Sequence, residues 1–178
     1  MPRFTADTLP DLQQTRALMH GLMTLIEDNI PRIQATRYDI TLKPDNSPVT
    51  ASDVFIEHLI CDYLKAQIPD ITFAGEETFT AETDLTSEGY YAILDPIDGT
   101  ENFCSGLKEW GVSFTLWHGK THLGSLLYLP ELREHLMTGD TLVPVHSRIR
   151  GFSSSMCDEI LQGMQETQES RLVVSRSW

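Results

Sequence analysis

The sequence predicts an α+β domain, with helices in the first part of the chain and a mostly antiparallel sheet after them. Residues 9–69 carry apolar side chains three and four positions apart, which is the spacing of one helix face. Residues 71–145 instead carry short apolar runs separated by turn residues, and runs joined by tight turns pair as antiparallel hairpins. Helices that pack on one side of such a sheet define the α+β class.

Two helices are predicted, at 9–37 and from Thr50 to Pro69. Their apolar faces consist of Leu18, Leu22, Leu25 and Ile26 in the first helix and Ile56, Leu59, Ile60 and Tyr63 in the second. Pro31 is expected to kink or end the first helix, because proline has no N–H group and crowds the preceding turn. Thr50 and Asp53 have the spacing of a capping box, which predicts the start of the second helix.

Six strands are predicted beyond the second helix. They span residues 71–74, 90–94, 112–118, 122–128, 134–138 and 142–145. The run at 90–94 is nearly all apolar, which favours a central strand, and residues 118–121 predict a hairpin turn. A helix at 158–168 and a strand at 171–175 are expected to begin a second domain. The expected domains are residues 1–148 and 149–178.

The chain is acidic, with a formal net charge of -13. This charge disfavours nucleic acid and anionic membranes as partners, because both attract basic surfaces. No apolar run approaches the roughly 20 residues that cross a bilayer, and the first residues lack the apolar stretch of a signal peptide, so a cytoplasmic location is expected. The three cysteines lack paired spacing and are expected to be reduced thiols. The acidity would also repel a phosphate ester, unless carboxylates hold divalent cations.

The segment LDPIDGTENF follows the apolar run at 90–94 directly. Asp95 and Asp98 can face one point across the intervening turn, and hard oxygen ligands at this density suit Mg²⁺. Gly99 allows the backbone to approach a ligand closely, and the N–H groups that follow it could cradle a phosphate. The alternative is an ordinary turn after a strand, since Asp-Pro and Asp-Gly are common turn formers.

Two further acidic segments precede this one. Glu76 and Glu77 follow the strand at 71–74, and they reach the same sheet end as Asp95 if the two strands are neighbours. Otherwise they belong to a solvated acidic loop. The third segment, KPDNSPVTASD, ends at Asp53, which a helix-capping role alone would explain.

The segments KPDNSPVTASD, GEE and LDPIDGTENF occur in this order, and GLKEWGVSFTLWHGK and GSLLYLP follow them. With these motifs the chain resembles the inositol monophosphatase family, from its first helix to about Thr138. The resemblance implies the layered sugar-phosphatase-like fold, with two N-terminal helices beside the sheet. It also implies Mg²⁺-dependent phosphatase activity, with two or three Mg²⁺ ions per site and Mn²⁺ as a possible substitute.

The resemblance also assigns roles to residues. Glu76, Asp95 and the Ile97 carbonyl would hold one Mg²⁺, and Asp95 and Asp98 a second. Thr100 would orient the attacking water, and Glu76 would help to guide its proton. The full assignment makes Thr100, Glu76 and Asp53 catalytic, Gly99 and Thr100 substrate-binding, and Lys43 and Glu77 supporting.

Family members continue into a second α/β half with a Trp-Asp-x-Ala-Ala segment, and nothing in this chain matches it. The expectation is therefore a first half with weak or no turnover, whose uncovered apolar surface and sheet edge favour a homo-oligomer. The alternative is a non-catalytic, metal-binding relative that acts through protein–protein association. The expected substrate is a small phosphate ester: a sugar phosphate such as inositol monophosphate, a 3′(2′),5′-bisphosphate nucleotide or histidinol phosphate.

Overall fold

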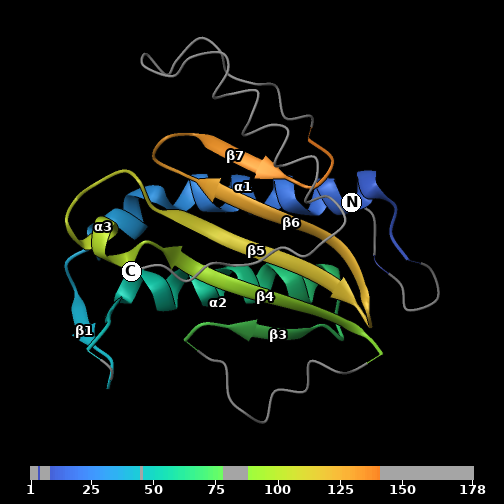
Figure 1. Cartoon of the computed structure of the whole chain (residues 1–178), viewed down its shortest axis with the longest axis horizontal. Helices are drawn as coiled ribbons and strands as arrows, with labels where there is room; N and C mark the ends of the chain where they lie inside the picture. Colours follow the sequence, from blue (N-terminus) through green and yellow to red (C-terminus); the bar gives the residue numbers. More distant parts are fainter. Residues whose placement is uncertain (1–3, 5–8, 45, 78–87, 141–178) are drawn as a thin grey trace, which may run out of the picture. The chain divides into compact units, whose positions relative to one another are not determined.

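A computed structural model describes residue 4 and residues 9–44, 46–77 and 88–140 of the chain. These residues lie in one compact unit, in which two long helices cover one face of a sheet (Figure 1). The helices are α1 (Leu12–Ala35) and α2 (Ala51–Gln67). The predicted strands at 142–145 and 171–175, the helix at 158–168 and the boundary after residue 148 lie outside the described residues.

Within the described residues the main sheet has five strands, in the order β3-β4-β5-β6-β7. They are β3 (Thr72–Gly75), β4 (Tyr90–Asp98), β5 (Gly111–His118), β6 (Thr121–Leu129) and β7 (Glu134–Met137). The pair β3–β4 is parallel and the other neighbours are antiparallel, which confirms the predicted α+β class with a mostly antiparallel sheet. The strand predicted to be central, β4, is an inner strand, although β5 is the middle one.

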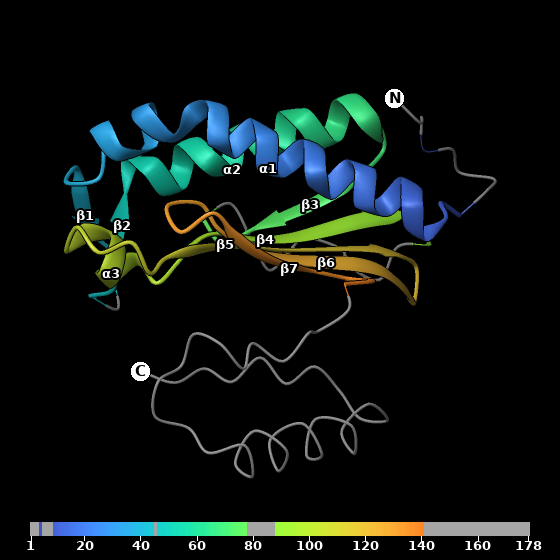
Figure 2. The ribbon, with the colours of Figure 1, turned by 90° about the horizontal axis from the view of Figure 1, so that it is seen from above.

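Three short elements surround the end of this sheet where β4 finishes. The strands β1 (Ile40–Leu42) and β2 (Pro48–Thr50) form an antiparallel pair that the sequence did not predict. The helix α3 (Thr100–Cys104) follows β4 directly. All three lie at the same end of the unit (Figure 2).

The helix boundaries follow from local hydrogen bonds. At the start of α1, Asp11 and Gln14 form a reciprocal capping box, and Thr50 and Asp53 form the predicted one at the start of α2. Pro31 was expected to kink or end the first helix. It does not end it, because α1 continues to Ala35, and the kink stays a prediction. The last turn of α1 is anchored, since Ile33 is buried in the core and its carbonyl oxygen accepts a hydrogen bond from the Ser52 hydroxyl at 2.7 Å.

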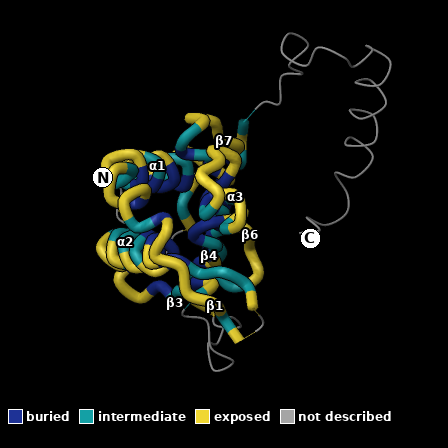
Figure 3. Tube along the Cα trace, turned by 90° about the vertical axis from the view of Figure 1, so that its left-hand side faces the viewer, coloured by how far each residue is buried: buried dark blue, intermediate teal, exposed yellow. Residues whose placement is uncertain are grey.

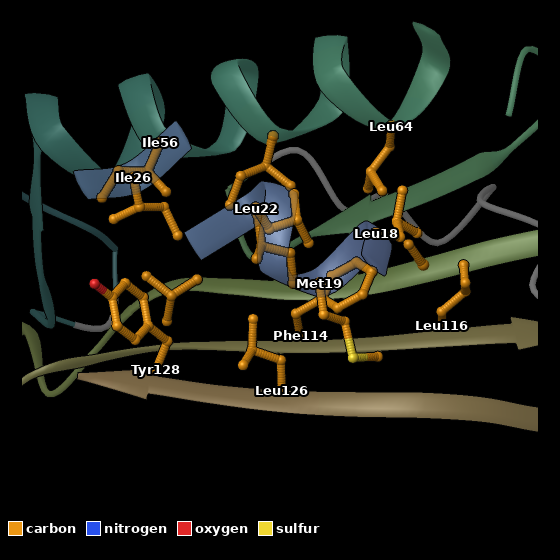
Figure 4. Packing of buried hydrophobic residues seen from close by; sticks show 14 of the residues in the cluster. Leu18, Met19, Leu22, Ile26, Ile56, Leu64, Phe114, Leu116, Leu126 and Tyr128 are labelled. Carbon is orange, nitrogen blue, oxygen red and sulfur yellow. The ribbon is translucent and has the colours of Figure 1, made fainter. Parts of the chain in front are cut away.

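The core lies between the helices and the sheet (Figure 4). Apolar side chains of α1 and α2 meet every second residue of the strands, as the alternation of a one-sided sheet requires. The residues at this interface include Leu18, Met19, Leu22, Ile26, Ile56, Leu64, Phe114, Leu116, Leu126 and Tyr128. The exposed residues of both helices lie on the sides turned away from the strands (Figure 3). Within the described ranges, no helix combines the length and the apolar composition that a membrane crossing requires.

Candidate metal and phosphate site

The predicted site segments meet at the carboxyl ends of β3 and β4. These strands are parallel neighbours, with Gly75 opposite Leu94, so Glu76 leaves β3 beside Asp95. The Glu76 N–H donates to the Leu94 carbonyl oxygen at 3.0 Å, which extends the pairing by one residue. The two strands are therefore neighbours, as the prediction required, and Glu76 and Asp95 lie at the same sheet end.

A bulge shapes the end of β4. The pairing with β5 runs from Asp95 opposite Ser113 to Asp98 opposite Gly111, so β4 uses one more residue than β5 over this span. Such a bulge breaks the strict alternation of side chains, which would otherwise send residues three apart to opposite faces. The Asp98 carboxylate also accepts a hydrogen bond from the Ser113 hydroxyl at 3.2 Å.

A tight turn joins the bulge to α3. Gly99 has a φ of 90° and a ψ of 43°, in the left-handed region where glycine is favoured over residues with a side chain. The Thr100 hydroxyl donates to the Ile97 carbonyl oxygen at 3.0 Å, back across this turn. The turn thus holds Thr100 against the strand end that carries Asp95, Ile97 and Asp98.

Lys43, which follows β1, reaches the site from outside the main sheet. Its Nζ lies 2.9 Å from Glu76 Oε1 and 2.7 Å from Glu77 Oε1. Although burial lowers the pKa of Lys43, these hydrogen bonds and the charges of the two carboxylates raise it overall. Lys43 is thus a charged link between β1 and the turn after β3.

Among the acidic residues at this strand end, Asp95 has the pKa that is shifted furthest from its usual value. Burial, and then the negative charges of Glu76 and Asp98, raise its pKa to about 7, and a hydrogen bond with Glu76 and the charge of Asp53 add to this effect. Asp95 Oδ1 is buried and has no hydrogen-bond partner among the described residues. Burial also raises the pKa of Asp53, against the hydrogen bonds that its carboxylate receives from Thr50.

These features bear on whether the residues fit a divalent cation. Among the described residues, no three carboxylate, histidine or cysteine side chains converge as a ready ligand group. The Glu76 carboxylate contacts Lys43 instead, and the Asp98 carboxylate accepts the hydrogen bond from Ser113. The chemistry nevertheless fits, since an unpartnered oxygen among like charges is relieved by a cation, and oxygen donors are what Mg²⁺ prefers.

Glu57 belongs to this region and was not predicted. It lies on α2, one turn after Asp53, with only 1% of its surface exposed. Its Oε2 accepts a hydrogen bond from the Glu77 N–H at 2.9 Å. The spacing of four residues from Asp53, on the apolar side of the helix, is the one signal in the sequence that could have indicated it.

Together the fold and these residues define an α+β protein with acidic side chains gathered where two parallel strands end. The chain belongs to the inositol monophosphatase family, because the sequence model of that family matches residues 10–171. It is 42% identical over 93 residues to inositol monophosphatase 1 of Solanum lycopersicum, a match that covers 51% of this chain and 33% of the relative. It is 38% identical over 93 residues to the 3′(2′),5′-bisphosphate nucleotidase CysQ of Shigella flexneri, covering 52% of this chain and 37% of the relative.

Solved structures share the fold. A staphylococcal inositol monophosphatase-1 soaked with LiCl superimposes with a TM-score of 0.66 at 21% identity, covering 73% of this chain and 49% of that one. An IMPase/NADP phosphatase complexed with Mg²⁺ and phosphate superimposes with a TM-score of 0.63 at 22% identity, covering 72% and 49%. The chain thus spans about a third of the curated relatives named above and about half of these solved chains.

Proposed function

We propose that this chain carries the site of a Mg²⁺-dependent phosphomonoesterase of the inositol monophosphatase type. The observation that carries the proposal is Asp95, whose unpartnered oxygen lies among the negative charges of Glu76, Asp98 and Asp53. Repulsion of this kind is relieved by a divalent cation. Membership of a phosphatase family supports the same conclusion.

Glu76, Asp95 and the Ile97 carbonyl are proposed to hold one Mg²⁺, and Asp95 and Asp98 a second. Two or three ions per site are expected, and Mn²⁺ should substitute. When bound, the ions would supply Lewis acidity toward water and toward the phosphate oxygens. The Gly99–Thr100 turn would present backbone N–H groups to the phosphate.

The chain's own groups would orient the water. The Thr100 hydroxyl donates to the Ile97 carbonyl, and a hydroxyl that donates in this way keeps lone pairs that accept a hydrogen bond. Thr100 can therefore accept an O–H of the attacking water and direct its oxygen toward the phosphorus. Glu76 would take part in moving the released proton, Asp53 would act through its charge on Asp95, and Lys43 and Glu77 would hold Glu76 in place.

The proposed substrate class is a small phosphate monoester. The names of two relatives point to inositol monophosphate and to a 3′(2′),5′-bisphosphate nucleotide, and histidinol phosphate remains a third candidate. The described residues offer the second ion two carboxylates, and misplacement of about 1 Å can lower a rate on the order of 10²-fold. We therefore expect slow turnover. Self-association also stays a prediction, which the exposed Ile93, Leu127 and Leu136 support.

Titration with Mn²⁺ and Mg²⁺, followed by calorimetry, tests the site. Asp95→Asn should lower the affinity by about 100-fold or more, since it removes the charge shared by both proposed ions. Asp140→Asn is the matched control. Asp140 pairs with Arg16 and contacts none of the proposed ligands, so this variant should leave the affinity unchanged. Equal affinity of Asp95→Asn and the wild type would contradict the metal assignment.

Activity is measured on the same proteins with inositol monophosphate, adenosine 3′,5′-bisphosphate and nitrophenyl phosphate at saturating Mg²⁺. Slow turnover that Asp95→Asn abolishes and Asp140→Asn preserves would support the phosphatase. Metal binding without turnover on any of the three would favour the alternative, a non-catalytic metal-binding relative.

A further inference from the structure

We propose that Glu57 is a positioning residue that fixes the turn after β3 and thereby sets the place of the Glu76 carboxylate. The inference rests on the proposed role of Glu76 as a metal ligand. Glu57 itself is buried under this turn, on α2, and its Oε2 accepts the Glu77 N–H at 2.9 Å. A carboxylate that accepts a hydrogen bond from a backbone N–H restrains the residues on both sides of that N–H.

The steric fit between Glu57 and Gly75 supports the same reading. A Cβ atom added to Gly75 would lie 2.1 Å from Glu57 Cδ, 2.3 Å from Oε2 and 2.4 Å from Oε1. These separations are far below contact distance, so the carboxylate occupies the space that a side chain at residue 75 would need. Gly75 is not among the described residues with positive φ, so close approach rather than backbone conformation requires glycine here.

Glu76 is consequently held from two directions. Its own N–H donates to the Leu94 carbonyl on β4, and the next N–H, that of Glu77, donates to Glu57 on α2. The first bond ties the turn to the strand that carries Asp95, and the second ties it to the helix that carries Asp53. The distance between the Glu76 and Asp95 carboxylates therefore depends on Glu57.

Packing alone does not account for a glutamate at this position. Three of the other buried residues of α2, Ile56, Ile60 and Leu64, are apolar, and the buried polar residues Ser52 and Asp53 lie in its first turn. The second carboxylate oxygen, Glu57 Oε1, is buried and has no hydrogen-bond partner within the described part of the chain. An unpaired buried oxygen weakens a fold, so the benefit of Glu57 lies in what its other oxygen holds.

The test compares Glu57→Leu, which removes the acceptor, with Glu57→Gln, whose amide oxygen can still accept the Glu77 N–H. In Mn²⁺ titrations, Glu57→Leu should bind about 10- to 100-fold more weakly, as loss of a group that orients a metal ligand typically does. Glu57→Gln should bind within about threefold of the wild type, because the hydrogen bond that orients the turn is retained. Gly75→Ala should resemble Glu57→Leu, since the added methyl group displaces the carboxylate.

Glu27→Leu is the control, because Glu27 also joins a helix to the sheet by one hydrogen bond, from the Tyr128 hydroxyl at 2.6 Å. It should leave Mn²⁺ affinity unchanged. Wild-type affinity in both Glu57→Leu and Gly75→Ala would overturn the proposal, as would a loss in Glu57→Gln equal to that in Glu57→Leu.

Amide hydrogen exchange of Glu77 in the metal-free protein is a readout that does not depend on metal. Exchange should be slow in the wild type and in Glu57→Gln and fast in Glu57→Leu. If the wild type binds no Mn²⁺ while these exchange rates hold, the proposed metal site fails and the role of Glu57 in fixing the turn stands. Fast exchange in the wild type would overturn that role.

Discussion

Acidic side chains occur in two places near α3, and their surroundings differ. In the first, Glu131 forms an ion pair with Arg37 and accepts a hydrogen bond from the Trp110 indole N–H at 2.8 Å. The Arg37 guanidinium also lies over the Phe103 ring of α3, 4.5 Å from its centroid. This Arg37–Glu131 group therefore contains its own cation and joins the end of α1 to the turn before β7.

The second group, made of Asp53, Glu76, Asp95 and Asp98, contains no such internal balance around Asp95. Burial and then the neighbouring carboxylates raise the pKa of Asp95, and Lys43 contacts Glu76 and Glu77 rather than Asp95. The comparison distinguishes two kinds of buried carboxylate, one paired with a cation and one surrounded by other carboxylates. The paired carboxylate holds parts of the fold together, whereas the clustered carboxylates lower stability and so require another explanation, which we propose is cation binding.

The largest expected effect is on the paired side. Glu131→Ala leaves the Arg37 charge buried without its partner and should lower the free energy of unfolding by about 3–5 kcal/mol. Urea unfolding measures this change. The double variant Arg37→Met with Glu131→Leu should recover much of the loss, because it removes both charges. A loss below about 1 kcal/mol in Glu131→Ala would mean that the pair behaves as an exposed one.

A smaller effect is expected on the clustered side, where removing a negative charge should stabilise the fold instead of destabilising it. The folded chain raises the pKa of Asp95 from 3.8 to about 7, so the folded state holds this proton more tightly than the unfolded state does. The contribution of Asp95 to stability is therefore full below about pH 4 and is lost as the pH rises to about 7. After allowance for solvent screening, the free energy of unfolding should fall by about 1–2 kcal/mol over this pH range.

Urea unfolding between pH 4 and 8, in chelator, checks this expectation with Asp95→Asn as the reference. Relative to the wild type, the variant should gain stability as the pH rises. Mg²⁺ added at pH 8 should stabilise the wild type and have little effect on the variant. A difference between the two proteins that does not change with pH would contradict the raised pKa of Asp95.

The smallest effect is expected at a partly exposed pair, Arg16–Asp140, where Arg16 Nη2 lies 2.8 Å from Asp140 Oδ1 and 27% and 22% of the side-chain surfaces are exposed. Burial raises the pKa of Asp140, but the hydrogen bonds from Arg16 and from the Met137 N–H, together with the charge of Arg16, lower it overall. Asp140→Asn should change the free energy of unfolding by at most about 1 kcal/mol, as is usual for exposed pairs. A loss as large as that of Glu131→Ala would show that burial is not what distinguishes these groups.

Local patterns in the sequence predicted much of the fold. The capping box at Thr50 and Asp53 and the hairpin turn between β5 and β6 depend on residues close in the chain, and both were predicted correctly. The pair β1–β2 was missed because its strands have three residues each and Ile40–Leu42 is exposed throughout, which leaves no alternation to detect. Pro31 does not end α1, because tertiary contacts of Ile33 hold the last turn of the helix.

The site was predictable only in part, for the same reason. The acidic segments and their order were visible, and the parallel pairing of β3 with β4 was a condition that the sequence could state but not decide. In the sequence Glu57 is an ordinary polar residue on a helix, because its contact with the turn after β3 depends on the tertiary fold. The partner that Arg37 finds in Glu131 lies 94 residues away, and no spacing rule connects them.

The bulge between Asp95 and Asp98 makes chain length critical at this point of the molecule. Deleting Pro96 would equalise the two strands and restore a regular ladder of backbone hydrogen bonds between β4 and β5. The same deletion would rotate Asp98 and the Gly99 turn to the opposite face of the sheet, because a shift of one residue reverses the side on which each following residue points. The irregular pairing at the end of β4 is therefore what brings the two aspartates to the same place.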